Sequence, residues 1–586
     1  MKSKKIFSKT FYLLNRNQKK NFFLMIFLLL VAGIVEMFSV GMIVPFASVL
    51  LNQESNTFNV LMYNFEQIFG INIENNQIII YGLGLFFIIF FIKFIFMSCL
   101  IFYKNYFLFS VRNSLSEKIF SIYLTKPYSF FISQNSSKLI LNCKYEVDLY
   151  LSNILQTTIE LFSEFIIMCS LLILILIMKP LVSTILILTF LIFIILYQFV
   201  LKKKTLRWGS EREYTDKEIN KLLIQSFGAI KDVILRFKQI FFLDKLGNFL
   251  KQNSVVSARQ LTSTEIPRFL MEFVAIVFFV SISIYFSKND QNFLEIIPYL
   301  GLYAAVAFKV LPAINRILAS IQRIRFGIPS SEILYDEIFK HNENENNSNK
   351  LKLLNKFNNK IFNKSIELKN IYYKYSDNSE NVLNNINIEI KKGEIVGIKG
   401  ESGAGKSTLI NLISTLENNY KGSILIDGED ITKKQDQWKS VIGYVPQNTF
   451  LFDDTIMNNI AFGIDDNDID INKLNEVMKI SQIYDFVYTL KDDIRTIIGE
   501  RGVKFSGGQI QRLAIARALY NDPQFLIFDE ATNALDKENE INLMESLINL
   551  KNNITILVIS HKNTLWKYTN KLYTIKNGNL LEIPNE

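Results

Sequence analysis

The feature that most constrains this chain is a set of long apolar runs in its first half. Hydrophobic residues make up 49% of the 586 residues, and they are unevenly placed. Six runs are long enough to cross a bilayer, which takes roughly 20 helical residues. They lie near residues 22–50, 78–103, 154–178, 181–201, 269–287 and 293–320. Beyond about residue 340, apolar and polar residues alternate, so we expect six transmembrane helices followed by an α/β domain.

A polar, asparagine-rich segment at 341–349 separates the two halves and is typical of a flexible linker. We therefore expect a transmembrane domain at 1–340, a linker at 341–360 and one compact domain at 361–586. Strand-like runs in the last part lie at 365–375, 385–390, 395–399, 422–426, 442–445, 525–528 and 555–559. Helical stretches separate several of them, which predicts an α/β core with an antiparallel β addition at its start.

The connecting segments differ in charge. The N-terminus and the segments 104–153 and 202–264 are rich in Lys and Arg, whereas 52–77 has glutamates and no basic residue. The positive-inside rule then places both termini in the cytoplasm. We expect a multi-pass protein of the cytoplasmic (inner) membrane, in contact with the lipid bilayer. The net charge of +9 is explained without nucleic acid as a partner. Gln225 to Phe237 and Lys126 to Lys138 are candidate breaks with short helices inside the long cytoplasmic segments.

The first outer loop carries an apolar pattern of its own over residues 58–69. Its apolar residues recur at helical spacing and predict a short amphipathic helix: Phe58, Leu61, Met62, Phe65, Ile68 and Phe69. Two interpretations remain open. The helix caps the bundle, or it lies at the outer leaflet and handles a lipid tail.

Several charges lie inside the apolar runs, where they are costly and are functional candidates by default. They are Glu36, Lys93, Arg268, Glu272, Lys309 and Arg316. Lys309 and Arg316 are seven residues apart and so share one helix face. One interpretation makes the four basic residues a cavity wall for an anionic, lipid-linked substrate with a phosphate or pyrophosphate headgroup. The alternative is ion pairing inside the bundle, for example with Glu36 or Glu272, or snorkelling of Lys93 and Arg268.

One segment of the α/β domain fits G-x-x-x-x-G-K-[ST], the phosphate-cradling P-loop. It reads Gly400, Glu401, Ser402, Gly403, Ala404, Gly405, Lys406, Ser407 and Thr408. It follows a strand-like run at 394–399 and opens a helix-like run at 409–416. Glycines let backbone N–H groups approach a phosphate, Lys406 is expected to reach the β- and γ-phosphates, and the Ser407 hydroxyl to ligate Mg²⁺. A chance glycine-rich turn is the alternative, so support must come from elsewhere.

That support is an apolar run at 525–528 that ends in Asp529 and Glu530. A buried parallel strand places both carboxylates at its carboxyl end, where open α/β sheets bind ligands. Asp529 is then suited to hold Mg²⁺ through water, and Glu530 to orient and deprotonate a water. A solvated strand end is the alternative, but together with the P-loop the pair indicates an NTPase.

A second phosphate-binding pattern, Phe505-Ser506-Gly507-Gly508-Gln509, precedes a helix-like run at 510–520. Backbone N–H groups at a helix N-terminus bind phosphate. One domain does not need two such sites for one γ-phosphate. We therefore expect the second pattern to serve the nucleotide of a neighbouring copy.

The order of the P-loop, Gln447, F-S-G-G-Q, Asp529-Glu530 and His561 resembles that of the ATP-binding cassette (ABC) transporters. With six preceding spans, nearly the whole chain is similar to an ABC exporter half-transporter. The resemblance implies ATP and Mg²⁺ as cofactors, with Ser407, Gln447 and Asp529 as metal ligands. It also implies a homodimer in which two cassettes enclose two ATP molecules head to tail.

The same resemblance implies roles for single residues. Glu530 matches the catalytic base, and His561 the switch histidine on the γ-phosphate. Gln447 matches the glutamine that links Mg²⁺ to the membrane domain. Tyr375 matches the aromatic residue that stacks on adenine, with a core tyrosine as the alternative. Ser506, with Gly508, is expected to contact the γ-phosphate bound to the partner's P-loop.

Two further loops match those of the family. Asn533-Ala534-Leu535-Asp536 resembles the loop that communicates between the two sites, with Asn533 in place of the commoner serine. Gly499-Glu500-Arg501-Gly502 resembles the exporter loop that meets the intracellular helices. Phe505 stands where leucine is usual and keeps an apolar anchor.

A narrower resemblance concerns bacterial lipid-linked oligosaccharide flippases. It rests on Glu265-Ile266-Pro267-Arg268, on Val310-Leu311-Pro312-Ala313-Ile314-Asn315-Arg316, and on Glu36 and Pro45. It implies ATP-driven flipping of a polyprenyl-pyrophosphate-linked oligosaccharide from the cytoplasmic to the outer leaflet. The alternatives are an ABC exporter of another cargo, such as a glycolipid, drug or peptide, and a non-hydrolysing ATP-gated channel, which the intact Glu530 disfavours.

Overall fold

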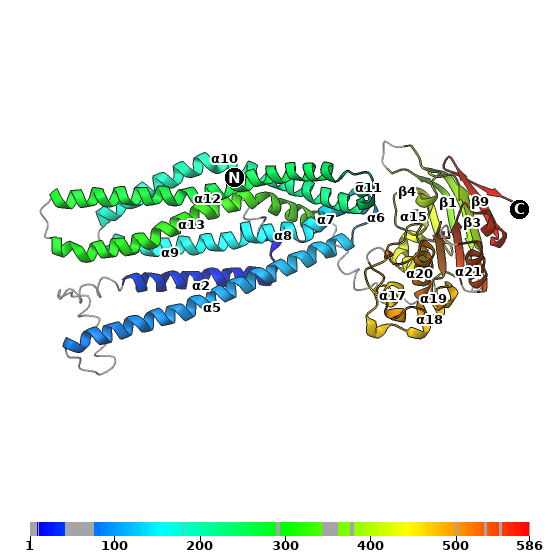
Figure 1. Cartoon of the computed structure of the whole chain (residues 1–586), viewed down its shortest axis with the longest axis horizontal. Helices are drawn as coiled ribbons and strands as arrows, with labels where there is room; N and C mark the ends of the chain where they lie inside the picture. The colour runs from blue at the N-terminus through cyan, green and yellow to red at the C-terminus, as the bar shows by residue number, and fades with distance from the viewer. Residues whose placement is uncertain are drawn as a thin grey trace. The chain divides into compact units, whose positions relative to one another are not determined.

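The chain divides into two compact units (Figure 1). The computed structural model describes residues 9, 11–41, 75–178, 180–288, 293–342, 361–375, 380–499, 502–532, 536–549 and 554–584. The helical unit comprises Met1–Lys126 and Ser133–Glu345, and the α/β unit comprises Pro127–Ile132 and Asn346–Glu586. An apolar helical part followed by an α/β part confirms the predicted fold class.

Each predicted apolar run overlaps a long helix within the residues that the structure describes. The helices are α2 Arg16–Gly41, α5 Asn75–Leu124, α9 Gln156–Met178, α10 Pro180–Gly228, α12 Gln239–Lys288 and α13 Phe293–Asn342. Within the described residues, three stretches are long and apolar enough to cross a membrane: Arg16–Val40, Phe87–Leu124 and Ser136–Leu174. Four of the helices continue well past their apolar runs. Helix α13 has 50 residues, which is about 75 Å at the α-helical rise per residue.

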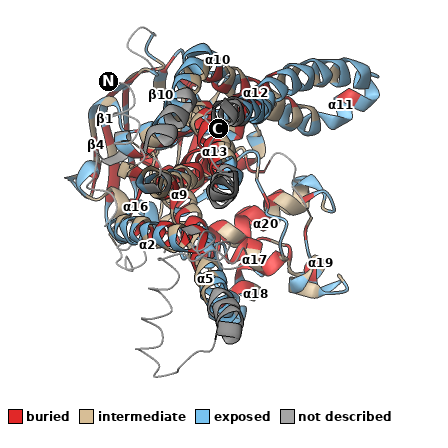
Figure 2. Cartoon of the chain, turned by 90° about the vertical axis from the view of Figure 1, so that its left-hand side faces the viewer, coloured by how far each residue is buried: buried red, intermediate tan, exposed pale blue. Residues whose placement is uncertain are grey.

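Short helices interrupt the long ones where breaks are predicted. Helix α6, Tyr128–Ser133, follows Pro127, and α7, Ser136–Cys143, is capped by the Asn135 side chain, which accepts from the Ser137 N–H. Helix α11, Ile230–Leu235, ends where Phe237 adopts a positive φ of 52° and the Lys238 N–H reaches the Val233 carbonyl at 2.9 Å. Helix α11 and the adjoining start of α12 are largely exposed (Figure 2).

The long helices pack pairwise, α9 against α2 and α13, and α10 against α12 and α13. At one crossing of α10 and α13 the backbones come very close. A Cβ built on Gly209 would lie 2.5 Å from the carbonyl oxygen of Phe326. Glycine is therefore required there, because any larger residue would push the two helices apart.

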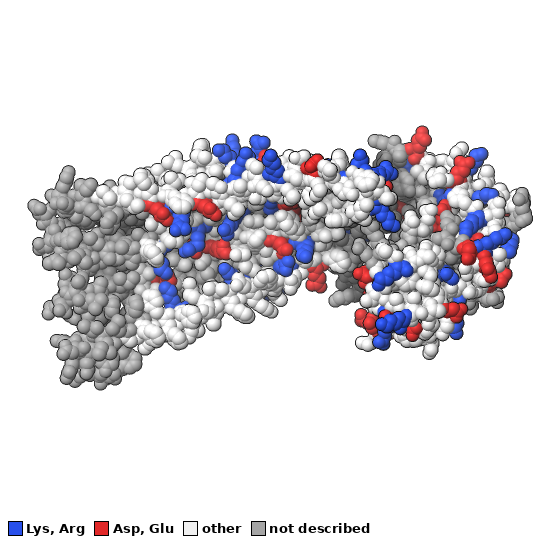
Figure 3. Space-filling view, viewed as in Figure 1, with Lys and Arg blue, Asp and Glu red and all other residues white. Residues whose placement is uncertain are grey.

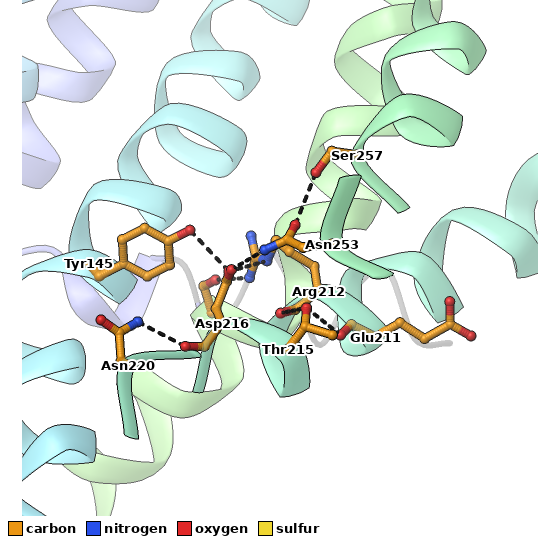
Figure 4. Close-up of polar contacts among 9 residues, drawn as sticks. Tyr145, Glu211, Arg212, Thr215, Asp216, Asn220, Asn253 and Ser257 are labelled. Atoms are coloured by element: carbon orange, nitrogen blue, oxygen red, sulfur yellow. Dashed lines mark hydrogen bonds and ion pairs between the residues drawn. The ribbon is translucent and has the colours of Figure 1, made fainter. Parts of the chain in front are cut away.

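A polar network joins helix α8, Tyr145–Tyr150, to α10, α12 and α13 (Figure 4). Asp216 is 8% exposed and accepts from the Tyr145 hydroxyl at 3.0 Å and from Asn253 Nδ2 at 2.6 Å. Arg212 Nε lies 3.5 Å from Asp216 Oδ2, and its Nη2 donates to Ser330 Oγ at 3.2 Å. The network fixes the positions of four helices relative to one another.

The α/β unit contains two sheets. The antiparallel sheet has the order β2-β1-β4-β5 and comprises β1 Ser365–Tyr373, β2 Leu383–Lys391, β4 Tyr420–Ile426 and β5 Glu429–Asp430. The six-stranded sheet has the order β10-β9-β3-β8-β7-β6 and comprises β3 Ile395–Gly400, β6 Ile442–Val445, β7 Phe525–Asp529, β8 Thr555–Ile559, β9 Lys571–Lys576 and β10 Asn579–Ile583. All seven predicted strands are present, and β5, β9 and β10 are additional.

Two hydrophobic cores lie on opposite faces of the six-stranded sheet, because alternate residues of a strand point to opposite sides. Leu526 and Phe528 of β7 pack in the core that includes α20, Gly507–Tyr520, whereas Phe525 and Ile527 pack in the core that includes α15, Lys406–Ile413. Other α-helices described between residues 361 and 584 are α16 Gln435–Ser440, α17 Ile456–Ile460, α18 Ile471–Ile480, α19 Tyr484–Tyr488 and α21 Lys537–Asn549.

Several boundaries differ from the sequence-based expectation. Helix α15 starts three residues earlier than predicted, at Lys406, and ends at Ile413, because Thr415 adopts a positive φ of 56°. Helix α20 starts at Gly507 rather than at Ile510. Helix α13 continues to Asn342, into the predicted linker, whose residues 343–360 lie outside the described part. Pro45, the helix expected at 58–69, and residues 500–501 and 533–535 lie outside it as well.

Candidate nucleotide-binding site

The P-loop joins the end of β3 to the start of α15. Gly405 has a φ of 106° at the position before the helix, a conformation that L side chains rarely adopt. Lys406 is 7% exposed, and its Nζ donates to the carbonyl oxygens of Gly400 at 2.6 Å and Glu401 at 3.1 Å. The neighbouring Ser407 side chain is exposed. The loop therefore holds a buried ammonium group beside an accessible hydroxyl.

Two other predicted residues lie at this ammonium group, and a third contacts one of them. Glu530 Oε1 lies 3.8 Å from Lys406 Nζ and 3.2 Å from His561 Nε2, which itself lies 3.1 Å from Lys406 Nζ. Gln447 Nε2 donates to Glu530 Oε2 at 2.8 Å. In one tautomer His561 Nε2 accepts from Lys406, and in the other it donates to Glu530. The structure thus brings Lys406, Glu530, His561 and Gln447 together from four separate segments.

Glu530 has an unusual backbone conformation. It follows the last residue of β7 with a φ of 51°, and its N–H donates to the Ile559 carbonyl of β8 at 2.9 Å. A non-glycine residue at positive φ is uncommon and clusters at functional sites. The turn directs the carboxylate away from the strand and toward the P-loop lysine.

Asp529 lies beside this cluster and is half-buried. Burial raises the pKa of its carboxyl group, and the neighbouring Glu530 raises it further. The Tyr444 hydroxyl, which donates to Asp529 Oδ2 at 3.2 Å, and Lys406 both lower this pKa. Oxygen donors from a carboxylate, a hydroxyl and an amide suit Mg²⁺, which otherwise keeps waters and substrate phosphates as ligands. Asp529, Ser407 and Gln447 therefore fit the predicted metal site.

Tyr375 lies next to the P-loop helix. Its hydroxyl is 2.8 Å from Thr408 Oγ1, and its ring packs edge-on against Tyr373 at 5.1 Å between centroids. With 57% of its surface exposed, the ring is not that of a core tyrosine, which is the alternative interpretation. Its stacking on adenine stays a prediction.

The second phosphate-binding pattern forms the start of α20. Ser506 Oγ accepts from the Gln509 N–H at 3.3 Å and Gln509 Oε1 accepts from the Ser506 N–H at 2.8 Å, a capping box. Gly507 and Gly508 form the first turn between them. Within the part of the chain that the structure describes, no hydrogen bond or ion pair joins these four residues to the P-loop. Their service to a second copy stays a prediction.

The four basic residues singled out inside the apolar runs are all ion-paired. Basic and acidic side chains lie next to one another at several places on the surface of the helical unit (Figure 3). Glu36, with its side chain 5% exposed, lies 2.5 Å from Lys93 Nζ and 2.9 Å from Lys309 Nζ. The two remaining pairs are Arg268 with Glu272 at 3.0 Å, and Arg316 with Glu164 at 2.6 Å. This geometry matches the ion-pairing alternative. Glu164 is not among the predicted residues, although it too is a charge inside an apolar run.

A cavity of about 380 Å³ lies next to Arg316 in the helical unit. Its charged lining residues are Lys104, Glu160, Glu164, Arg316 and Arg323, which come from α5, α9 and α13. Apolar residues such as Leu29 and Met97 complete the wall. The cavity is therefore amphipathic, with three cations and two carboxylates.

Comparison with known proteins finds similarity in both sequence and fold. Residues 383–533 match the family described as ABC transporter. The alpha-hemolysin translocation ATP-binding protein HlyB of Escherichia coli O157:H7 is 40% identical over 218 residues, which is 37% of this chain and 31% of that protein. The leukotoxin translocation ATP-binding protein LktB of Mannheimia glucosida is 38% identical over 218 residues, 37% of this chain and 30% of its own length. The match thus spans about a third of the length of each of these relatives.

A solved structure covers nearly the whole fold. It is a bacterial Atm1-family ABC exporter with ATP bound, which aligns with a TM-score of 0.75 over 97% of this chain and 95% of its own, at 20% identity. None of these three similar proteins is a lipid-linked oligosaccharide flippase, so that narrower resemblance stays a prediction. Residues 383–533 of the α/β unit thus match the ABC transporter family, and the chain as a whole has a fold similar to that of a bacterial Atm1-family ABC exporter.

Proposed function

We propose that the chain is one half of an ATP-driven membrane exporter. The observation that carries this is the convergence of Lys406, Glu530, Gln447 and His561 on one point beside the P-loop. Hydrolysis needs a cation at the transferred phosphoryl group, a base for the attacking water and a contact to the γ-phosphate. Lys406 is of the type that supplies the cation, Glu530 of the type that supplies the base, and His561 of the type that contacts the γ-phosphate.

In this mechanism Glu530 accepts a proton from a water whose oxygen attacks the γ-phosphorus. The bond from that phosphorus to the bridging oxygen breaks, and ADP and phosphate leave. Lys406 neutralises charge that develops on the phosphate oxygens. Mg²⁺, when bound at Ser407, Gln447 and Asp529, supplies further neutralisation of the phosphates.

The complete site requires a second copy. The exposed Ser506 caps the N-terminus of α20, and the partly exposed Gly508 lies in its first turn, which suits a phosphate held by a partner. We therefore propose a homodimer in the cytoplasmic membrane with both termini in the cytoplasm. Closure of the two cassettes on ATP would drive the helical units from inward-open to outward-open.

For the cargo we propose an anionic lipid-linked molecule, and more specifically a polyprenyl-pyrophosphate-linked oligosaccharide. Two groups of charged residues in the helical unit favour an anionic cargo. Two lysines face Glu36, and three cations face two carboxylates around the cavity. Each group retains one positive charge more than it has carboxylates, and Lys93, Lys309 and Arg316 belong to these groups.

A second candidate is export of a polypeptide, which the names of the hemolysin and leukotoxin translocation proteins favour. Their similarity extends over 218 residues, about the length of the α/β unit. The cargo of an exporter is bound by its membrane helices instead, so this support is indirect.

Purified protein in liposomes distinguishes the two cargoes. We expect ATP hydrolysis to rise several-fold with a polyprenyl-pyrophosphate oligosaccharide, and not with an unfolded polypeptide of similar mass. The same liposomes should move the labelled glycolipid to the opposite leaflet only with ATP. Stimulation by the polypeptide alone would replace the flippase proposal with the second candidate.

A further inference from the structure

We infer that Tyr444 is a positioning residue for the metal end of the nucleotide site. Its hydroxyl holds Asp529 in the orientation that the metal needs. The inference rests on the proposed ATP hydrolysis, because it assigns a task within that site. Tyr444 has no predicted role in the nucleotide site, and its contact with Asp529 emerges from the strand arrangement.

The sheet register explains how Tyr444 reaches Asp529. Strands β6 and β7 are parallel, with Tyr444 paired to Ile527 and Val445 to Phe528. Asp529 is two residues beyond Ile527 and so points to the same face of the sheet. The tyrosine ring therefore extends along the strand direction from the level of Ile527 to that of Asp529. Its hydroxyl donates to Asp529 Oδ2 at 3.2 Å.

The contact separates two carboxylates that repel each other. Asp529 and Glu530 are adjacent, and each has its own donor from the same segment of chain. Tyr444, at the end of β6, donates to Asp529 Oδ2, and Gln447, three residues later, donates to Glu530 Oε2 at 2.8 Å. Because Tyr444 occupies Oδ2, the other oxygen of Asp529 stays available for a metal-bound water.

The arrangement also limits where Asp529 can turn. The ammonium of Lys406 attracts the carboxylate, and a direct Asp529–Lys406 pair would compete with both metal and phosphate. A neutral hydroxyl donor fixes the side chain without adding a charge. Tyr444 is 39% exposed, so its hydroxyl is not needed to satisfy a buried core, and a solvated strand tyrosine without a role is the alternative.

The test replaces Tyr444→Phe, which removes one hydroxyl and keeps the ring. The readout is Mn²⁺ binding to the full-length, ADP-loaded protein in detergent, followed by electron paramagnetic resonance. We expect the Mn²⁺ dissociation constant to rise about tenfold, or about 1.4 kcal/mol, while ADP binding without metal stays unchanged. Hydrolysis should require correspondingly more Mg²⁺ for half-maximal rate.

Two further variants make the result more specific. Tyr488→Phe removes a hydroxyl that donates to Asn475 at the surface at 3.0 Å, and it should leave Mn²⁺ binding as in the unaltered protein. In an Asp529→Asn background, Tyr444→Phe should have no additional effect, because the hydroxyl acts through that carboxylate. Unchanged Mn²⁺ binding in Tyr444→Phe would overturn the inference, and so would a full additional loss in the Asp529→Asn background.

The metal-binding readout separates the inference from the proposed function. Metal binding with ADP requires neither hydrolysis nor transport. If the unaltered protein failed to hydrolyse ATP but Tyr444→Phe still weakened Mn²⁺ binding, the proposed function would fail and the inference would stand. If hydrolysis were active and the Mn²⁺ affinity were the same in both proteins, the inference would fail and the proposed function would stand.

Discussion

Lys406 links the P-loop to the other residues of the nucleotide site. Its ammonium group touches two carbonyl oxygens of its own loop, the His561 ring and, at longer range, the Glu530 carboxylate. Nucleotide binding therefore exchanges these partners for phosphate oxygens. In the proposed mechanism Lys406 is therefore both a structural part of the loop and the cation that hydrolysis requires.

Replacement Lys406→Ala should abolish ATP hydrolysis and transport when present in both copies. The loss of a cation at the transferred phosphate is expected to lower the hydrolysis rate at least 100-fold, on the order of the effect of removing one electrostatic contact from a transition state. The exposed Lys399 of β3 supplies the control, and Lys399→Ala should hydrolyse ATP normally. Transport that survived Lys406→Ala would contradict the mechanism.

The sequence predicts which side chains gather beside the P-loop lysine, because the motifs are short and each motif places its own side chains; the roles of these residues in nucleotide binding and hydrolysis stay predictions. The motifs place Gln447, Glu530 and His561 at the P-loop, where the structure has them. They do not predict Tyr444 or Glu164, since nothing near these two in sequence identifies their partners. Tyr444 meets Asp529 only through the β6–β7 register, and Glu164 meets Arg316 from a different helix.

At the level of secondary structure elements, an ion pair between the partly exposed Lys562 and the buried Glu540 joins the strand end that carries His561 to helix α21. Lys562 Nζ lies 3.3 Å from Glu540 Oε1 and donates to the Thr532 carbonyl at 2.7 Å. Glu540 is 1% exposed and accepts from the Thr564 hydroxyl at 2.9 Å. The Lys562 side chain therefore fixes the chain just after His561 both to helix α21, through Glu540, and to the chain just after Glu530, through Thr532.

Lys562→Ala should destabilise the α/β unit by about 3–5 kcal/mol, because it leaves a buried carboxylate without its cation. Thermal unfolding in detergent measures this, with the exposed Lys392→Ala as control. The double variant Lys562→Met, Glu540→Met should regain most of the loss, since an apolar pair of similar volume often replaces a buried ion pair without cost. A double variant as unstable as Lys562→Ala would point to the Thr532 contact instead.

Most elements follow from sequence patterns, and the exceptions have local causes. Buried strands such as β7 and β8 are continuous apolar runs, so they are easily recognised. Strands β9 and β10 are not predicted because polar residues interrupt them, although Asn577-Gly578 between them is a typical hairpin turn. The end of α15 differs from the prediction because Thr415 adopts a positive φ, which its residue type does not favour.

On the scale of the whole molecule, the buried carboxylates of the helical unit differ in the number of cations that pair with them. Two lysines share Glu36, whereas Glu164 is paired with Arg316 through two guanidinium nitrogens, at 2.6 and 3.0 Å. Both carboxylates are largely buried. Removing one lysine leaves Glu36 neutralised, but removing Arg316 leaves Glu164 without that partner.

We therefore expect Arg316→Gln to lower the thermal unfolding midpoint more than Lys309→Gln. Removing the cationic partner of a buried carboxylate is destabilising, and only the arginine variant takes away the cation that is paired with its carboxylate, because Glu36 keeps Lys93 when Lys309 is replaced. If the cargo is anionic, Lys309→Gln should keep basal ATP hydrolysis and lose its stimulation by the lipid-linked substrate. Unchanged flipping in both variants would remove these residues from the substrate site, and loss of basal hydrolysis would indicate misfolding.

The packing of the start of the P-loop against β9 has a consequence for folding during synthesis. Gly400 is paired with Ile575 of β9, and a Cβ on Gly400 would lie 2.7 Å from the Ile575 carbonyl oxygen. Strand β9 follows the P-loop by more than 160 residues. At about 5–20 residues per second, a ribosome needs roughly ten to thirty seconds to add them. During that interval the emerging P-loop lacks its neighbouring strand, and a chain interrupted before Lys571 never acquires it.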